Sequence, residues 1–228
     1  MIISGLVKSS LVDFPGLVSC ILFLPGCNYN CFYCHNRSLI DGTHEIIDNS
    51  EIKLFLKKRR GMIDGVVITG GEPTLQPDLK QYIKMLKDMD YKVKLDSNGS
   101  DPKLIEEFLK EKLVDYFAID YKAPCARYEE ICGKDAHADE VLETIGILLK
   151  NNADFEVRTT VIPQFSENDL IQMAKELPIL PRYVLNRYRQ PEKYLPCDKE
   201  RIEKRPYTQS DIEVFVKKLK EYQPNITT

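Results

Sequence analysis

Three cysteines, Cys27, Cys31 and Cys34, lie close together in the stretch Leu24 to Asn36, with C-x3-C-x2-C spacing. Cysteine thiolates are the usual ligands of iron–sulfur clusters, and three of them on one short loop can bind three irons of a [4Fe–4S] cluster. The loop contains no obvious fourth thiolate. The spacing therefore predicts a cluster with one open iron, where a substrate can coordinate.

Two other interpretations of the same cysteines remain open at this point. One is a zinc knuckle, completed by His35 or by a distant cysteine, and the other is a set of three unrelated buried thiols. Zinc sites usually combine two C-x2-C pairs, or one cysteine pair with one histidine pair, and neither pattern is completed here. The spacing favours the cluster over zinc.

The composition indicates one sizeable globular domain. The chain has 228 residues, of which 43% are hydrophobic, enough to bury a core without disulfides. Its formal net charge is −3, and basic residues are interspersed with acidic ones, so nothing supports a nucleic-acid partner.

The sequence also indicates a compartment. The N-terminal stretch lacks the features of a signal peptide, and no apolar run reaches membrane-spanning length. The odd number of cysteines, seven, argues against a secreted disulfide framework. We therefore expect a cytoplasmic protein with no membrane partner.

Strand-like and helix-like segments alternate along the chain. Ser166, with Asp169 three residues later, predicts the N-terminal cap of one helix. Six β-α units predict a parallel sheet, either open or curled into an incomplete barrel. The predicted strands are 18–24, 65–69, 91–95, 115–119, 155–162 and 183–188, and the predicted helices are 50–60, 77–89, 102–110, 138–150, 166–178 and 210–222.

Polar residues follow several predicted strands, at the sheet edge where active sites form. Strand 115–119 is followed by Asp120 and Lys122, which alternation places on one side. Arg158 lies inside an apolar strand, so its charge should be paired or bind a ligand. Each residue alone fits ordinary capping or an ion pair. The other strand ends carry Thr69-Gly-Gly-Glu-Pro73 and Leu95-Asp-Ser-Asn-Gly99.

Taken together, these motifs resemble the radical SAM superfamily. The resemblance rests on the cysteine spacing, on Tyr33 before the last cysteine, and on Gly-Gly-Glu-Pro after the second predicted strand. Further motifs resemble the activating enzymes of glycyl-radical enzymes, most of all the activating proteins of anaerobic ribonucleoside-triphosphate reductase, with pyruvate formate-lyase activators as close relatives. These are Leu11-Val-Asp-Phe-Pro-Gly16, Cys34-His-Asn36, Asp96-Ser-Asn-Gly99 and Asp120-Tyr-Lys122.

The resemblance covers roughly residues 3 to 190 and implies a fold and a domain organisation. The fold class is α/β, a partial (β/α)6 barrel of radical SAM type with parallel strands and outer helices. Residues 1–228 would form a single radical SAM domain, with a core at about 16–190 and a C-terminal loop and helix at 191–228.

The resemblance also implies the chemistry. Cys27, Cys31 and Cys34 would bind a [4Fe–4S] cluster, and the amino and carboxylate groups of S-adenosyl-L-methionine (SAM) would chelate the fourth iron. A reduced cluster would cleave SAM to a 5′-deoxyadenosyl radical, which would abstract hydrogen from a glycine of a partner glycyl-radical enzyme. The electron donor would be a protein such as flavodoxin or ferredoxin.

The family's cofactor-binding positions carry over residue by residue. Gly70, Gly71, Glu72 and Pro73 match the motif that receives the methionyl amino group, and Tyr33 matches the aromatic position whose backbone touches adenine. Positions near the ribose and the methionyl carboxylate are matched by Asp96, Lys122 and Arg158, and a monovalent-cation site is suggested by Asp96, Ser97 and Asp120.

The chain also departs from the family pattern. Phe14 replaces the first glycine of the Asp-Gly-Pro-Gly that related activators commonly carry, which puts in question how the glycine loop of the partner enters. The chain has no eight-cysteine ferredoxin insert, and Cys125, Cys132 and Cys197 are too scattered to predict a second cluster. The Pro- and charge-rich loop 191–206 fits a mobile cover, a binding loop or plain solvated surface.

Two alternative functions remain. One is a radical SAM synthase that acts on a small molecule, such as a pterin-derived substrate. The other is an iron–sulfur or zinc protein without catalysis, in which Gly-Gly-Glu-Pro would have no ligand.

Overall fold

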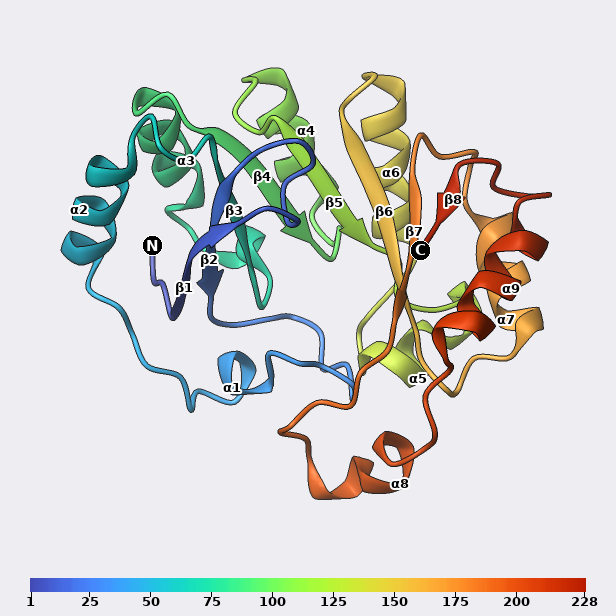
Figure 1. The fold of residues 1–228 in the computed structure, drawn as a ribbon. Coiled ribbons are helices and arrows are strands. Elements are labelled where there is room, and N and C mark those ends of the chain that lie inside the picture. The colour runs from blue at the N-terminus through green and yellow to red at the C-terminus, as the bar shows by residue number, and fades with distance from the viewer. The chain divides into compact units, whose positions relative to one another are not determined.

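The computed structural model describes residues 1–228 and has a mostly parallel α/β fold (Figure 1). The order of strands in the sheet follows the chain from β1 to β8. The strands are β1 (Gly5–Ser10), β2 (Ser19–Leu24), β3 (Gly65–Gly70), β4 (Lys92–Ser97), β5 (Tyr116–Asp120), β6 (Phe155–Val161), β7 (Tyr183–Arg187) and β8 (Ile226–Thr227). The helices are α1 (Arg37–Ile40), α2 (Asn49–Arg59), α3 (Leu79–Asp88), α4 (Pro102–Lys110), α5 (Tyr128–Cys132), α6 (Asp139–Lys150), α7 (Glu167–Glu176), α8 (Lys199–Ile202) and α9 (Gln209–Leu219).

The chain divides into two compact units. Unit 1 comprises Met1–Asn28, Ser38–Ser97 and Lys103–Ala118, and unit 2 comprises Tyr29–Arg37, Asn98–Pro102 and Ile119–Thr228. None of the helices has the length and apolar character needed to cross a membrane.

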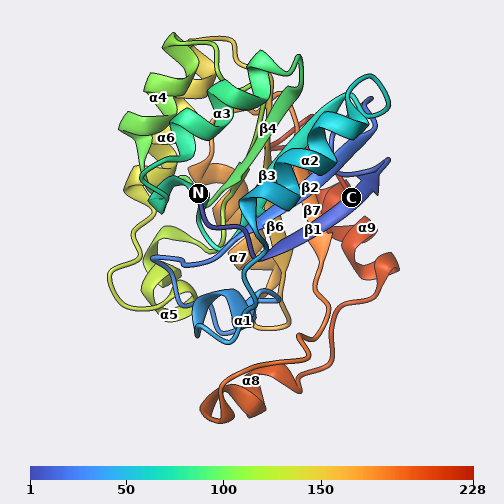
Figure 2. The same cartoon turned by 90° about the vertical axis from the view of Figure 1, so that its left-hand side faces the viewer.

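Unit 1 contains a parallel core flanked by one antiparallel strand. β2 pairs in parallel with β3, and β3 with β4, whereas β1 is antiparallel to β2. β2 is buried almost throughout, as expected for a strand covered on both faces. Helix α3 packs against β4 (Figure 2), and the residues buried along one side of this helix are Leu79, Tyr82, Ile83 and Leu86.

Phe14 belongs to the apolar core of unit 1. Its side chain is 4% exposed and packs with Ile21 and Val67, and its ring centroid lies 6.2 Å from that of Tyr116. A Cβ atom at Gly65 would lie 2.8 Å from Cδ1 of the Phe14 ring, closer than real Cβ contacts allow. The aromatic residue at position 14 therefore depends on the glycine at the start of β3.

Unit 2 contains β6, β7 and β8, which pair in parallel. Its helices α7 and α9 lie side by side, and each begins with a capping box (Figure 1). In α7 the cap is Ser166 with Asp169, which confirms the cap predicted from the sequence. In α9 the cap is Thr208 with Asp211, so this helix begins at Gln209 and ends at Leu219, rather than spanning 210–222.

The predicted fold class and all six predicted strands are confirmed. The edge strands β1 and β8 and the short helices α1, α5 and α8 were not predicted. The two strands are only partly buried and form through pairing with distant partners, and the three helices are five residues long or shorter. Such segments carry too few residues for a hydrophobic period.

Candidate functional site

In unit 1, the Gly-Gly-Glu-Pro turn after β3 is hydrogen-bonded to the backbone that leads into Cys27. The Gly71 amide donates to the Leu24 carbonyl at 2.8 Å, and the Glu72 amide donates to the Gly26 carbonyl at 2.7 Å. The start of the cysteine loop and the Gly-Gly-Glu-Pro turn, which lie more than forty residues apart in the sequence, are therefore joined through their backbones.

The two glycines are required by this close approach. Gly70 has φ +123°, and a Cβ there would lie 2.4 Å from the Leu24 backbone. A Cβ at Gly71 would lie 1.9 Å from the Gly26 carbonyl oxygen. Because both obstacles are backbone atoms, no side-chain movement could relieve them.

The Glu72 carboxylate is fully buried and is used to hold the turn. Its Oε1 accepts hydrogen bonds from the Thr74 amide (3.1 Å), the Thr74 hydroxyl (2.7 Å) and the Ser97 hydroxyl (2.8 Å). Ser97, the last residue of β4, is thereby connected to the Gly-Gly-Glu-Pro turn. Pro73 is also buried and begins a 3₁₀ helix of one turn, Pro73–Leu75.

Asp96 lies on β4 beside a buried cation. The Lys94 ammonium is 2.8 Å from Asp96 Oδ1, and the Lys94 side chain is only 3% exposed. A buried lysine requires such a partner. Asp96 therefore presents a paired carboxylate, rather than an isolated one, at the carboxyl end of its strand.

In unit 2, the second half of the cysteine loop docks on α5. The Asn30 amide donates to the Cys132 carbonyl at 2.7 Å, and the Cys34 amide donates to the Cys31 carbonyl at 3.1 Å. Gly133, at φ +97°, passes so close to Asn30 that a Cβ there would be 3.0 Å from the Asn30 Cβ. The loop thus follows the end of α5 closely.

The thiol of Cys132 lies against Cys31. The hydrogen bond from Cys132 lowers the pKa of Cys31, with burial opposing it and the Lys122 ammonium adding to it. For Cys34 the effect of burial is larger than that of its hydrogen bond from the Asn36 backbone, and the pKa of its thiol is raised. Cys132 itself is completely buried.

Aromatic rings surround the loop. The Tyr33 ring meets the Phe32 ring edge to face at a centroid distance of 5.3 Å, and the Tyr188 ring at 6.4 Å. All three are less than a tenth exposed, and burial raises the pKa of Tyr33 well above its usual range. Tyr33 therefore remains a neutral phenol with a fixed ring.

Asp120, at the end of β5, Lys122, two residues later, and Arg158, in the middle of β6, form one ion-pair triad. Asp120 Oδ1 accepts from Arg158 Nε at 3.0 Å, and Asp120 Oδ2 accepts from Lys122 Nζ at 3.0 Å. Burial alone would raise the pKa of Asp120, but the charges of Arg158 and Lys122 outweigh it and lower this pKa to about 2. The triad confirms that Asp120 and Lys122 share a side and that Arg158 is paired, and it carries one surplus positive charge.

The donor set of the cysteine loop fits an iron–sulfur cluster. None of the three thiols is in a disulfide, and Cys27 and Cys34 are partly exposed while Cys31 is buried. Thiolate sulfur is a soft donor, and three such donors on one loop suit iron and sulfide.

The sequence matches the family model described as "Radical SAM superfamily" over residues 21–177, which is most of the chain. The chain belongs to the radical SAM superfamily. It is therefore an enzyme of radical SAM type, and the family implies a [4Fe–4S] cluster and SAM as cofactors.

The chain is similar to proteins with several different names. A protein named "Putative glycyl-radical enzyme activating enzyme" from Methanocaldococcus jannaschii is 34% identical over 87% of both chains. A "7-carboxy-7-deazaguanine synthase" from Clostridium acetobutylicum is 32% identical over 50% of this chain and 51% of its own. The solved structure of Streptococcus suis SuiB bound to S-adenosylmethionine has a TM-score of 0.67 at 16% identity, covering 91% of this chain and 51% of that one, a likeness of fold.

Within each unit, the structure brings the predicted residues together. Unit 1 joins the backbone before Cys27 to the Gly70–Pro73 turn and Ser97, and unit 2 holds Cys31, Tyr33 and Cys34 with the Asp120 triad. The contact of Cys132 with Cys31 was not predicted from the sequence. The spacing of Tyr128, Ile131 and Cys132, at i, i+3 and i+4, would have indicated a buried helical face.

Proposed function

We propose that this radical SAM enzyme activates a partner glycyl-radical enzyme, of the anaerobic ribonucleoside-triphosphate reductase class, by abstracting hydrogen from one of its glycines. The relative from M. jannaschii supports this proposal, because it matches over most of both chains and carries an activating-enzyme name. The observation that carries the cofactor chemistry is the backbone edge formed by Leu24, Gly26, Gly71 and Glu72, which leads directly into Cys27.

Under this proposal Cys27, Cys31 and Cys34 hold the cluster. A bound and reduced cluster supplies the electron that cleaves SAM to a 5′-deoxyadenosyl radical, the species that takes hydrogen from glycine. The chain contributes the binding groups and their orientation. Its hydrogen-bonded edge holds the start of the cysteine loop, and the contact between Asn30 and Cys132 holds the rest.

The residues around the loop would bind SAM. The Gly70–Pro73 turn would receive the methionyl amino group, and the surplus positive charge of Lys122 and Arg158 would attract the methionyl carboxylate. Tyr33 would support the adenine with its backbone. Asp96 would contact the ribose, with its carboxylate oriented by Lys94.

Some finer assignments belong to the same proposal. A monovalent cation would be bound by Asp96, Ser97 and Asp120, although each of these side chains already has a protein partner: Lys94 for Asp96, Glu72 for Ser97 and Arg158 for Asp120. Flavodoxin or ferredoxin would donate the electron. We also propose that residues 1–228 act as one radical SAM domain in the cytoplasm.

The test is anaerobic reconstitution with iron and sulfide, followed by reduction and addition of SAM. Mixing with a purified glycyl-radical enzyme of the anaerobic ribonucleoside-triphosphate reductase class should produce the glycyl-radical doublet in the electron paramagnetic resonance (EPR) spectrum, together with 5′-deoxyadenosine. The Cys31→Ala variant should produce neither. SAM cleavage without any protein radical would reject the activase assignment and retain the radical SAM chemistry.

A second candidate is a synthase acting on a small molecule. It is favoured by the match to the 7-carboxy-7-deazaguanine synthase over half of this chain. This function predicts that a purine- or pterin-like compound, rather than a protein, stimulates 5′-deoxyadenosine formation. Stimulation by the partner protein and none by such compounds would exclude it.

A further inference from the structure

The segment between β7 and α9, which includes α8, is attached to the rest of unit 2 by specific hydrogen bonds. Gln164 Nε2 donates to the Arg201 carbonyl at 2.7 Å, and the Tyr207 hydroxyl donates to the Phe165 carbonyl at 2.6 Å. Within the segment, Gln190 Nε2 donates to the Ile202 carbonyl at 3.0 Å. The Ile202 side chain is 2% exposed. This segment, residues 188–207, is therefore more than solvated surface, and we call it the strap.

One side chain of the strap reaches the cysteine loop. The Arg201 guanidinium carbon lies 3.8 Å from the centroid of the Phe32 ring, the distance of a direct cation–π stack. Phe32 stands between Cys31 and Cys34 and is 4% exposed. Phe32 directly follows Cys31 and precedes Cys34 by two residues, so a contact that fixes Phe32 restrains the backbone between these two cysteines.

Arg201 is itself fixed in orientation. Its Nη2 donates to the Glu130 carbonyl on α5 at 3.0 Å, and its Nη1 lies 3.7 Å from Asp198 Oδ1. A planar guanidinium can stack on a ring and donate from its edge at the same time, which an ammonium cannot do. The Arg201 guanidinium thus makes both the stack on Phe32 and the hydrogen bond to α5.

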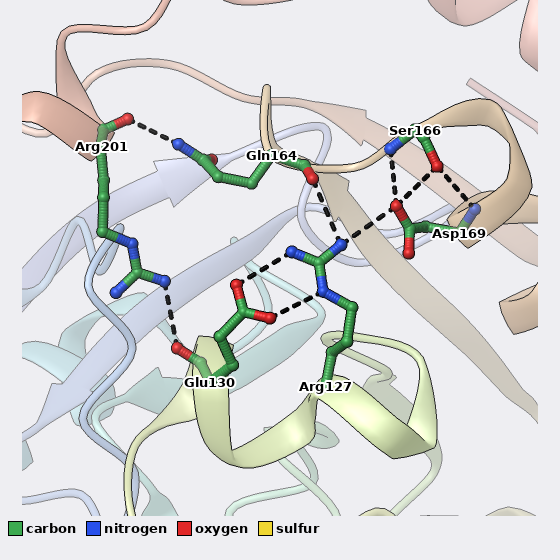
Figure 3. A network of polar contacts seen from close by, with 6 residues as sticks. All are labelled: Arg127, Glu130, Gln164, Ser166, Asp169 and Arg201. Carbon is green, nitrogen blue, oxygen red and sulfur yellow. Dashed lines mark hydrogen bonds and ion pairs between the residues drawn. The ribbon is translucent and has the colours of Figure 1, made fainter.

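Glu130 on α5, whose carbonyl accepts the hydrogen bond from Arg201, is itself held by other residues. Figure 3 shows the Arg127 guanidinium between the Glu130 and Asp169 carboxylates, with the Gln164 carbonyl as a further acceptor. Gln164 in turn donates to the Arg201 carbonyl. The network closes a ring from Arg201 through Glu130, Arg127 and Gln164 back to Arg201.

The cysteine loop therefore contacts the rest of unit 2 at two positions. On one side the Asn30 amide is bonded to the Cys132 carbonyl of α5, and on the other the Phe32 ring is covered by Arg201. Tyr188, at the start of the strap, adds an edge-to-face contact with Tyr33.

We propose that Arg201 is a positioning residue for the cysteine loop and that the strap keeps Cys31 and Cys34 in their ligating arrangement, which slows the loss of iron. The inference rests on the family's cluster being bound by these cysteines. It assigns to residues 188–207 a role in cluster retention.

The experiment compares reconstituted wild-type chain with Arg201→Ala, Arg201→Lys and Arg205→Ala under anaerobic conditions. Arg205 is an exposed arginine of the same strap and serves as the matched control. The rate at which a chelator removes iron, measured as the loss of visible cluster absorbance, should be about tenfold higher in Arg201→Ala. Arg201→Lys should be intermediate, and Arg205→Ala should match wild type.

A second readout separates positioning from general stability. The urea midpoint of the cluster-free Arg201→Ala chain should shift no more than that of Arg205→Ala, while trypsin should cut its strap faster and the remaining chain at the wild-type rate. Iron release at the wild-type rate in Arg201→Ala would overturn the inference. The inference would also be overturned if faster iron release in Arg201→Ala came with a lowered urea midpoint and with faster trypsin cleavage along the whole chain, because Arg201 would then only stabilise the fold. A wild-type chain that takes up no iron would overturn both this inference and the proposed cofactor chemistry.

Discussion

The thiol of Cys132, at the end of α5, hydrogen-bonds to the thiol of Cys31, the middle cysteine of the predicted cluster loop, and lowers its pKa. The two residues are brought together by the bond between the Asn30 amide and the Cys132 carbonyl. A fourth thiol thus lies beside one of the cysteines proposed to bind the cluster, which raises the question whether Cys132 also binds iron.

We expect Cys132 to support a ligand rather than to be one. Cys132→Ala should still assemble about four irons per chain, as a [4Fe–4S] cluster requires. Because the variant loses a hydrogen bond to the Cys31 sulfur, its reduction potential should become more negative. The measurements are iron and sulfide analysis and an EPR-monitored redox titration. Loss of the cluster in Cys132→Ala, to the same extent as in Cys31→Ala, would show that Cys132 is a ligand.

Gly71→Ala should separate the Gly-Gly-Glu-Pro turn from the backbone before Cys27. The new Cβ would meet the Gly26 carbonyl oxygen at 1.9 Å, so the hydrogen bonds of Gly71 and Glu72 to this stretch would be lost. We expect a stability loss of about 3 kcal/mol in urea unfolding, together with loss of SAM binding in equilibrium dialysis. Gly146→Ala in α6, where nothing lies within 4 Å of the new Cβ, is the control and should be slightly stabilised. Wild-type SAM binding by Gly71→Ala would contradict the proposed role of this edge.

The packing of Phe14 on Gly65 predicts coupled stability effects. Gly65→Ala should lower the free energy of unfolding by about 1–3 kcal/mol, because its Cβ collides with the Phe14 ring. Phe14→Ala alone should also destabilise, through the cavity it leaves in the core. In the double variant the collision is absent, so the two losses should sum to more than the measured effect. Strict additivity in urea unfolding would indicate that the two residues do not interact.

The ion-pair triad predicts a pH-dependent contribution to stability. The folded-state pKa of Asp120 is about 2, below its ordinary value of 3.8, so the ionised carboxylate stabilises the fold above pH 3.8. This contribution is lost as the pH falls through 2. Asp120→Asn should therefore cost about 1–2 kcal/mol at pH 6, reduced from the full linkage value because a third of the side chain is exposed. The gap between the urea midpoints of variant and wild type should close towards pH 2. A gap that is constant with pH would contradict the triad.

Local patterns were sufficient to predict much of the fold and several site residues. The central strands are long apolar runs, and the cap formed by Ser166 and Asp169 depends only on residues three apart, so both could be predicted from the sequence. That Asp120 and Lys122 lie on the same side followed from strand alternation.

Contacts between distant segments could not be predicted in this way. Cys132 lies about a hundred positions after Cys31, and Arg201 still further from Phe32, and no periodicity connects such segments. The structural requirement for glycine at positions 70 and 71 could be predicted only in part. Glycine after a strand indicates unusual backbone torsions, but it does not show that the backbone of Leu24 and Gly26 lies against these two residues. The burial of Phe14 similarly depends on Gly65, which is about fifty positions away.

The most direct test of the central claim is Mössbauer spectroscopy of the ⁵⁷Fe-reconstituted protein, recorded with and without SAM. If Cys27, Cys31 and Cys34 hold a [4Fe–4S] cluster whose fourth iron binds SAM, one of the four iron sites should change its isomer shift when SAM is added, and the other three should not. Four iron sites that are unaffected by SAM, or the absence of a four-iron cluster in the wild-type protein, would contradict the account.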